Sequence, residues 1–105
     1  MRSNSATLKG ARGAPEIYFT IRVWKENGTY VGYSPELDVS SCGDSVSQAK
    51  SRLKEAVSLF LEDASLRGTL TDILIETGFE RRRGVYRPPA VVAREKVKLA
   101  LPIAS

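Results

Sequence analysis

The pattern of hydrophobic and polar positions is clearest between Gly43 and Gly68, where it predicts one long amphipathic helix. Apolar residues recur in this stretch at steps of three and four, which places them on one stripe of a helix. Ser45 followed by Gln48 is typical of a capping box at the first turn, and Arg67 next to Gly68 is typical of a helix end. Such a stripe must pack on another element of the fold. The apolar stripe of the predicted helix consists of Val46, Ala49, Leu53, Ala56, Val57, Phe60, Leu61 and Ala64.

An alternating pattern before this helix predicts the strands on which it packs. The segment from Glu16 to Glu26 alternates and is rich in β-branched and aromatic residues. Asn27-Gly28 is a strong signal for a two-residue hairpin turn, because both residues tolerate positive φ. Residues 29–34 then form the returning strand, and Gly32 leaves room for a close approach of the helix. The predicted cross-strand pairs are Arg22 with Tyr33, Val23 with Gly32, and Trp24 with Val31.

The rest of the chain completes an α+β fold. Residues 37–41 predict a short third strand, and residues 71–77 predict a second, shorter helix that ends at Gly78. Residues 79–87 look like a basic connector. Residues 91–101 alternate again, with lysines on one side, which predicts a half-buried strand at a sheet edge. The expected order is β-β-β-α-α-β, in which a three-stranded antiparallel meander plus a C-terminal strand pack against one long helix.

Length and composition indicate one cytoplasmic globular domain after a short arm. Residues 1–15 are small, polar and basic and are expected to be a flexible arm. Residues 16–105 form the single domain, with residues 16–68 as its core and residues 69–105 as the short helix, connector and final strand. Hydrophobic residues make up 42% of the 105 residues, and no apolar run approaches the ~20 residues of a membrane span. The N-terminus also lacks the apolar core of a signal peptide.

The chemistry-bearing residues favour a protein that binds over one that catalyses. The sequence has no histidine and one cysteine, Cys42, so a zinc site or a histidine-based triad is not expected. Glu36, Asp38 and Asp44 are the nearest approach to a carboxylate cluster. We interpret them as loop and helix-cap residues, with a magnesium-dependent nuclease as a distant alternative. We expect no cofactor, no metal and no enzymatic activity.

Two sets of residues are candidates for contact with a partner. The first is an aromatic and apolar set that alternation places on the sheet face turned away from the helix, namely Tyr18, Trp24, Val31 and Tyr33. This face is covered either by the chain itself or by a partner or second copy. The second set is the arginines of the connector, Arg81, Arg82, Arg83 and Arg87, which can meet nucleic acid or an acidic partner, or simply be solvated. The net charge of +4 permits the nucleic-acid interpretation without demonstrating it.

The segment from Ile17 to Glu62 resembles the HicB family of type II antitoxins. The resemblance implies a partial ribonuclease-H-like fold without the catalytic carboxylates of the nuclease. It also implies a homo-oligomer that binds and silences a HicA-type mRNA-cleaving toxin. Residues after Gly78 do not resemble the DNA-binding segment that many family members carry, so operator binding is not expected. The alternative is a stand-alone RNA- or protein-binding domain of the same fold that uses the arginine-rich connector. The matching pieces are Tyr30 to Tyr33, Ser34-Pro35-Glu36-Leu37, Gly43-Asp44-Ser45, Glu55-Ala56 and Leu61-Glu62.

Overall fold

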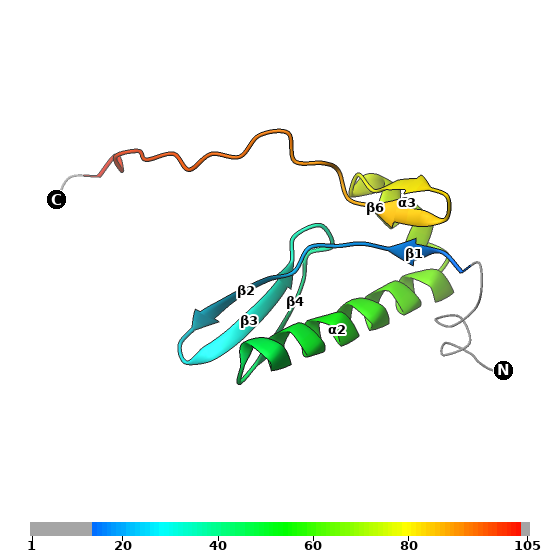
Figure 1. The fold of residues 1–105 in the computed structure, drawn as a ribbon, viewed down its shortest axis with the longest axis horizontal. Coiled ribbons are helices and arrows are strands. Elements are labelled where there is room, and N and C mark those ends of the chain that lie inside the picture. The colour runs from blue at the N-terminus through cyan, green and yellow to red at the C-terminus, as the bar shows by residue number, and fades with distance from the viewer. Residues whose placement is uncertain (1–13, 104–105) are drawn as a thin grey trace.

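The computed structural model describes residues 14–103 and confirms an α+β fold in which a long helix packs on small sheets (Figure 1). The predicted N-terminal arm lies outside the described residues, apart from its last two positions. Two three-stranded sheets are present, with strand orders β2-β3-β4 and β1-β6-β5. The elements are β1 (Glu16–Ile17), β2 (Arg22–Glu26), β3 (Thr29–Ser34), β4 (Val39–Gly43), α2 (Val46–Leu66), α3 (Leu70–Glu76), β5 (Glu80–Arg82) and β6 (Val85–Arg87).

The meander β2-β3-β4 has the predicted hairpin and the predicted register. Asn27 and Gly28 close the first hairpin with φ values of 50° and 81°, the left-handed region that a two-residue turn of this type requires. Val23 pairs with Gly32, and the neighbouring pairs follow from it. The third strand begins at Val39, two residues later than predicted.

Helix α2 begins and ends where its sequence signals indicate. The Ser45 hydroxyl accepts a hydrogen bond from the Gln48 amide at 3.0 Å, and the Gln48 side chain accepts one from the Asp44 amide at 2.6 Å. These two bonds satisfy amides that would otherwise lack partners at the first turn. At the other end Gly68 adopts a φ of 74°, which lets the chain leave the helix without steric cost.

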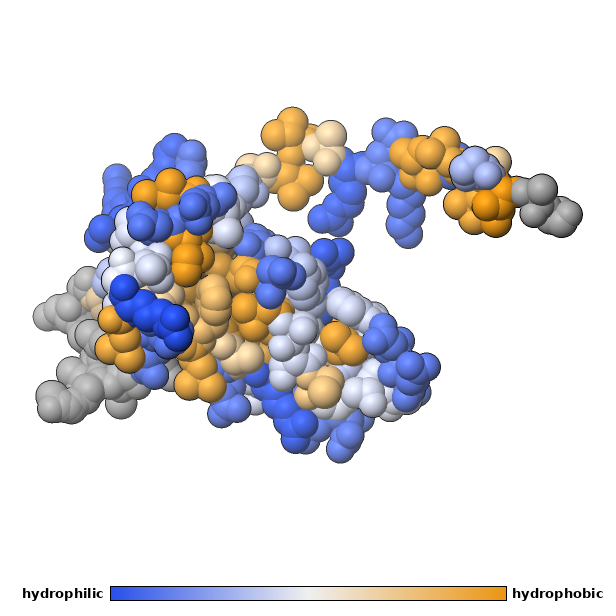
Figure 2. Space-filling model, turned by 180° about the vertical axis from the view of Figure 1, so that it is seen from behind, coloured by the Kyte–Doolittle hydropathy of each residue, from blue (hydrophilic) through white to orange (hydrophobic). Residues whose placement is uncertain are grey.

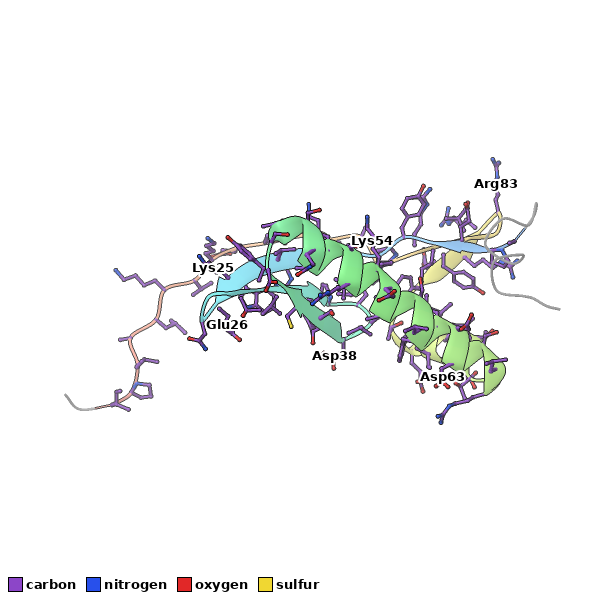
Figure 3. All side chains as sticks on the ribbon, turned by 90° about the horizontal axis from the view of Figure 1, so that it is seen from below. Lys25, Glu26, Asp38, Lys54, Asp63 and Arg83 are labelled. Atoms are coloured by element: carbon purple, nitrogen blue, oxygen red, sulfur yellow. The ribbon has the colours of Figure 1, made fainter. Side chains whose placement is uncertain are left out.

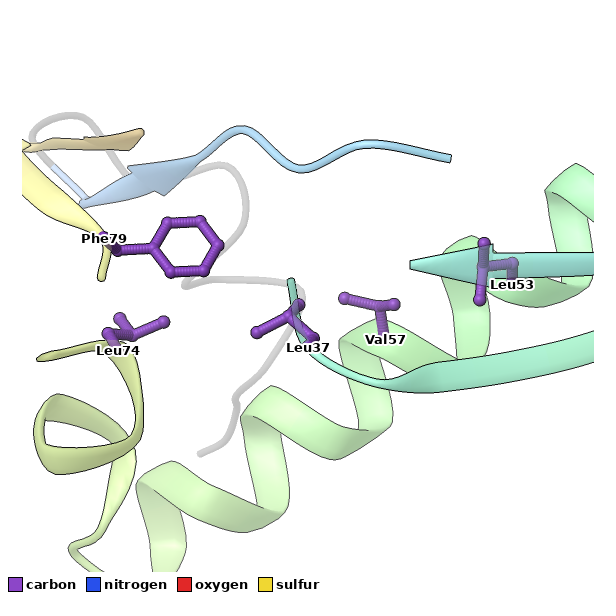
Figure 4. Close-up of a cluster of buried hydrophobic side chains, with 5 residues drawn as sticks. All are labelled: Leu37, Leu53, Val57, Leu74 and Phe79. Atoms are coloured by element: carbon purple, nitrogen blue, oxygen red, sulfur yellow. The ribbon is translucent and has the colours of Figure 1, made fainter. Parts of the chain in front are cut away.

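The helix lies close to the meander because β3 carries a glycine beneath it. A Cβ atom at Gly32 would lie 3.0 Å from the Ala49 carbonyl oxygen, so a larger residue there would push α2 away. Around this contact the fold builds one core between α2, α3 and both sheets (Figure 4). Its buried cluster consists of Leu37, Leu53, Val57, Leu74 and Phe79.

The predicted first strand, Glu16 to Glu26, is divided between the two sheets. Its first residues form β1, which pairs in parallel with β6, and only its last five residues pair with β3. Strand β3 ends at Ser34 before Pro35, so residues 18–21 have no strand beside them on that side. The Thr20 amide instead donates to the Glu36 carboxylate at 2.9 Å. The prediction of one continuous strand was therefore wrong.

The predicted basic connector, residues 79–87, is a hairpin. Strands β5 and β6 pair antiparallel, and Arg83-Gly84 closes them with φ values of 53° and 76°. These are nearly the angles of the Asn27-Gly28 turn. A two-residue turn flanked by short extended segments is a hairpin signal, but the run of arginines masks it.

The predicted C-terminal strand, residues 91–101, is not formed within the chain. The segment is extended, belongs to neither sheet, and is exposed at every position. After the end of β6 at Arg87, the chain runs away from the second sheet and past the β2–β3 turn (Figure 1). Two consecutive prolines cannot donate to a sheet ladder, which explains why the pairing of β6 with β1 is not continued.

Candidate functional site

The outer face of the meander, which is the face turned away from α2, carries a cluster of side chains that the first hairpin brings together. The pairings of Arg22 with Tyr33 and of Trp24 with Val31 put all four residues on this face, as the sequence predicts. The rings of Trp24 and Tyr33 meet edge to face, with centroids 6.1 Å apart. Trp24 nevertheless remains 42% exposed. We call Trp24, Val31 and Tyr33 the aromatic face.

Polar contacts hold both rings of the aromatic face in place. The Tyr33 hydroxyl donates to the Asp38 carboxylate at 2.9 Å, and the Arg22 guanidinium lies 5.6 Å from the centroid of the same ring. The hydrogen bond to Asp38 raises the pKa of Tyr33 above its ordinary value. The Trp24 indole donates to the Glu26 carboxylate at 3.4 Å. The rings are therefore ordered before any partner arrives, which lowers the entropy lost on binding.

Strand β4 adds two residues to this face that the sequence analysis missed. Ser40 is paired with Tyr33, and Cys42 is paired with Val31, so both side chains point outward beside the aromatic face. The thiol of Cys42 is free and exposed. The predicted third strand ended at residue 41, which left Cys42 in the turn before the helix, whereas Ser40 lay inside the predicted strand but was not among the candidate residues.

Tyr18, the fourth residue of the predicted aromatic set, lies beside the other sheet. Its amide donates to the Tyr86 carbonyl at 2.9 Å, and the Arg87 guanidinium lies 4.5 Å from its ring centroid. Because the predicted strand is divided after β1, alternation no longer places Tyr18 with Trp24. The structure brings together three of the four predicted residues.

The four arginines of the predicted second set do not converge. In the β5–β6 register, Arg82 and Arg87 share a face, whereas Arg81 points to the opposite face and lies 5.7 Å from the Tyr86 ring centroid. Arg83 projects from the tip of the hairpin, at the far end of the molecule from the β2–β3 turn (Figure 3). A patch that holds phosphates needs several cations on one surface, which this hairpin does not offer.

The carboxylates considered for metal binding are engaged separately. Glu36 accepts from the Thr20 amide, Asp38 accepts from the Tyr33 hydroxyl, and Asp44 precedes Ser45, the N-cap of helix α2. Within residues 14–103, no group of three or more acidic, histidine or cysteine residues is placed to hold a metal ion.

An apolar hollow of about 200 Å³ lies between β1, β6 and the end of α2. Tyr86 and leucines of both helices line it, together with Ile17 and Pro15. A site for a small molecule normally adds a few convergent polar groups to such walls. Among the described residues that line the hollow, Glu16 is the one charged side chain, so several polar groups do not converge there and the aromatic face remains the better candidate.

Comparisons of the chain with family models, with curated proteins and with solved structures give no match. Among the described residues, no helix combines the length and the apolar character needed to cross a bilayer.

Proposed function

We propose that this protein is a HicB-like antitoxin of the cytoplasm, which binds a HicA-type mRNA-cleaving toxin and neutralises it through protein–protein contacts. The observation that carries the proposal is the exposed, pre-ordered aromatic face on the meander. The sequence resemblance supports it, because the resembling stretch, Ile17 to Glu62, spans most of the unit formed by β2, β3, β4 and α2. In this proposal the protein acts as a homo-oligomer and by binding alone.

The aromatic face has the composition of a protein interface. Tryptophan and tyrosine supply much of the energy at interfaces, and they do so with few rotatable bonds to immobilise. Trp24 and Tyr33 already contact each other edge to face, so a partner meets a fixed surface. Neutralising an RNA-cleaving toxin requires only that such a surface covers the toxin's RNA-binding groups, with no acid–base chemistry in the antitoxin.

The charges at the rim of the aromatic face favour a basic partner. Glu26 lies at the β2–β3 turn and Asp38 at the β3–β4 turn, so a carboxylate stands at each end of the face (Figure 3). Carboxylates around an apolar centre steer a positively charged surface onto it. The Arg22 guanidinium beside Tyr33 adds one positive charge to the two carboxylates, so the face keeps a small negative excess that suits the basic surface of an RNA-binding toxin better than RNA. The divergence of the arginines on the second hairpin also weakens the RNA-binding alternative.

The test is co-expression with a HicA-type toxin, taken from the reading frame beside this protein's own. The wild-type chain is expected to restore growth and to co-purify with the toxin. Replacing Trp24 and Tyr33 with alanine should weaken binding by about 100-fold or more, because hot-spot residues each contribute about 2 kcal/mol or more.

Tyr18→Ala provides the matched control, because Tyr18 is also an exposed tyrosine beneath an arginine but lies beside the other sheet. It should leave toxin binding unchanged. Equal binding by the wild type and the Trp24/Tyr33 double variant would exclude the aromatic face as the interface. Growth that the wild-type chain does not restore would exclude the antitoxin function itself.

A further inference from the structure

The C-terminal segment from residue 88 to residue 103, which we call the tail, has the pattern of a strand but no sheet to join. Its apolar residues at alternate positions are 67–82% exposed, and Figure 2 shows apolar and basic residues following one another along a segment clear of the body. The radius of gyration is 17.3 Å, compared with about 13 Å for a compact chain of this length. These alternating residues are Val91, Val97, Leu99, Leu101 and Ile103.

Both β2 and β4 are edge strands of the meander, and β2 is the more open of the two. The β4 edge is partly covered, because the Arg52 guanidinium of α2 donates to the Cys42 carbonyl at 3.3 Å. At the other edge, Glu26 and Thr29 flank the two-residue turn and bond to each other across it, so the outward backbone groups of β2 belong to Val23 and Lys25. Within residues 14–103 these outward groups have no hydrogen-bond partner. An unpaired edge of this kind accepts an added strand.

A parallel closure of the tail onto β2 of the same chain opposes like charges. Strand β6 is parallel to β1, in the register of Ile17 with Tyr86. Continued along the chain, this register sets Arg94 opposite Lys25 and Glu95 opposite Glu26. Like charges directly opposite each other destabilise a sheet. The same parallel register also places residues 97–103 beyond the end of β2, where no strand is available.

An antiparallel closure within one chain fails on length. The tail would have to run the full length of β2 and then reverse. From Tyr18, beside the end of β6, to the turn at Asn27 an extended chain spans about 30 Å at ~3.3 Å per residue. Residues 88–95 span slightly less than this when fully extended, so none remain for the reversal.

We propose that residues 96–103 of one copy add antiparallel to the free edge of β2 in a second copy, and that the exchange is reciprocal. One register gives suitable neighbours to the side chains on both faces of the added strand. Its apolar residues continue the row of Phe19, Ile21 and Val23, and Pro102 falls where the strand's amide would point away from β2. The pairs within β2 are Lys96 with Glu26, Val97 with Lys25, Lys98 with Trp24, Leu99 with Val23 and Ala100 with Arg22. Leu101, Pro102 and Ile103 then lie along Ile21, Thr20 and Phe19, the segment that precedes β2.

This register places complementary groups together and forms a closed assembly. Lys96 meets the Glu26 carboxylate, and Lys98 lies beside the Trp24 ring, where its ammonium is attracted to the π face. Because each copy donates the same segment and accepts it at the same edge, the product is a two-fold symmetric dimer. The exchange does not depend on a toxin, so it can be tested separately from the proposed function.

The first test uses cysteine pairs in a Cys42→Ser background. Arg22→Cys with Ala100→Cys places one pair in the proposed register, at a position where cross-strand side chains come closest. Mild oxidation should give a covalent dimer on a non-reducing denaturing gel. Arg22→Cys with Val91→Cys is the matched control, because these residues are opposite only in the parallel closure within one chain. A disulfide within one chain in this control, or no dimer in the first variant, would overturn the proposal.

The second test removes the tail. The full chain should show twice its 11.5 kDa mass in light scattering. A chain ending at Ala90 should show the single mass and keep the helical part of its far-ultraviolet circular dichroism spectrum, because residues 91–103 are exposed and belong to neither helix. A monomeric full chain, or a shortened chain that still dimerises, contradicts strand exchange.

Discussion

The two hairpins of this protein share one turn geometry and differ in how their sequences specify it. Asn27-Gly28 and Arg83-Gly84 both adopt positive φ at both turn positions. Asparagine adopts this conformation readily, whereas for most other residues it costs about 1–2 kcal/mol. The first hairpin is therefore specified by its own turn. The second is imposed by its surroundings, through the pairing of β6 with β1 and the packing of Tyr86 against the core.

The hairpins also differ in what covers them. Strand β3 lies directly beneath α2, close enough that a Cβ atom at Gly32 would require the helix backbone at Ala49 to shift. Strands β5 and β6 are three residues long, and every residue of β5 is exposed. Elements with few buried contacts open locally without unfolding the rest. We therefore expect the first hairpin to unfold with the core, and the second to open alone.

We expect the largest loss of stability from a substitution that weakens the packing of α2 on the meander. Leu53, on the face of α2 that packs on β3, is fully buried, and Leu53→Ala should lower the free energy of unfolding by about 3 kcal/mol, from lost burial and the cavity left behind. Urea unfolding followed by circular dichroism measures it. Leu59→Ala is the matched control, because Leu59 lies on the exposed side of the same helix, and it should cost less than about 0.5 kcal/mol. Equal losses in the two variants would show that α2 does not hold the meander.

We expect the next largest loss of stability from replacing Asn27, the residue that specifies the first turn. Asn27→Ala places alanine at a φ of 50°, which should cost about 1 kcal/mol in the same urea measurement. Asn27→Gly is the control, since glycine adopts this conformation freely, and it should remain close to the wild type. If alanine is tolerated as well as glycine, the turn is imposed by its surroundings here too.

We expect a smaller effect on stability from a substitution that gives the second hairpin the Asn-Gly turn of the first. Arg83→Asn relieves the strain of arginine at a φ of 53° and should stabilise β5 and β6 by about 0.5 kcal/mol. The measurement is slower hydrogen exchange at the amides of β5 and β6, because local opening does not alter the urea midpoint. Arg82→Asn, in the adjacent extended strand, should not slow exchange. A similar change in both variants would attribute the effect to lost charge.

The parts of the fold that could be predicted are those with local signals. The Asn-Gly turn sets the pairs from Arg22 to Trp24, and Ser45 and Gly68 mark the ends of α2. The divided first strand could not be predicted, because its first half depends on β6, which is far away in the sequence. The strand pattern at residues 91–101 is present, but a single chain offers it no edge in a suitable register and direction.

The same distinction applies to the candidate site. The alternating pattern on either side of the Asn27-Gly28 turn predicts that Trp24, Val31 and Tyr33 share a face, and the structure brings them together. Cys42 was missed because β4, which follows the turn at Asp38 with its φ of 55°, continues two residues further than predicted, to Gly43. That conformation belongs to the turn that also supplies the carboxylate for Tyr33, so it depends on a contact that the sequence pattern does not reveal.

We expect the smallest effect on stability from the hydrogen bond between Tyr33 and Asp38, a contact that the tyrosine beside the other sheet does not make. Tyr33 and Tyr18 each lie beneath an arginine, but only Tyr33 also has a side-chain carboxylate partner among the described residues, Asp38 at 2.9 Å. The hydrogen bond to Asp38 favours the protonated hydroxyl and raises the pKa of Tyr33 above the ordinary value of about 10. The folded protein therefore holds this proton more tightly than the unfolded chain does. The resulting stability is present in full below about pH 10 and is lost as the pH rises through the folded-state pKa.

Asp38→Asn isolates this contribution, because asparagine also tolerates the φ of 55° at this position. Tyrosinate absorbance, read as the difference between each protein and its Tyr33→Phe counterpart, should show Tyr33 titrating at lower pH in Asp38→Asn than in the wild type. The stability difference between wild type and Asp38→Asn should shrink as the pH rises above about 10, because the wild type then opposes two negative charges. A difference that is constant with pH would mean that Asp38 acts through its turn conformation alone. The aromatic face would then owe its order to the packing of Trp24 against Tyr33 and not to the polar contacts at its rim.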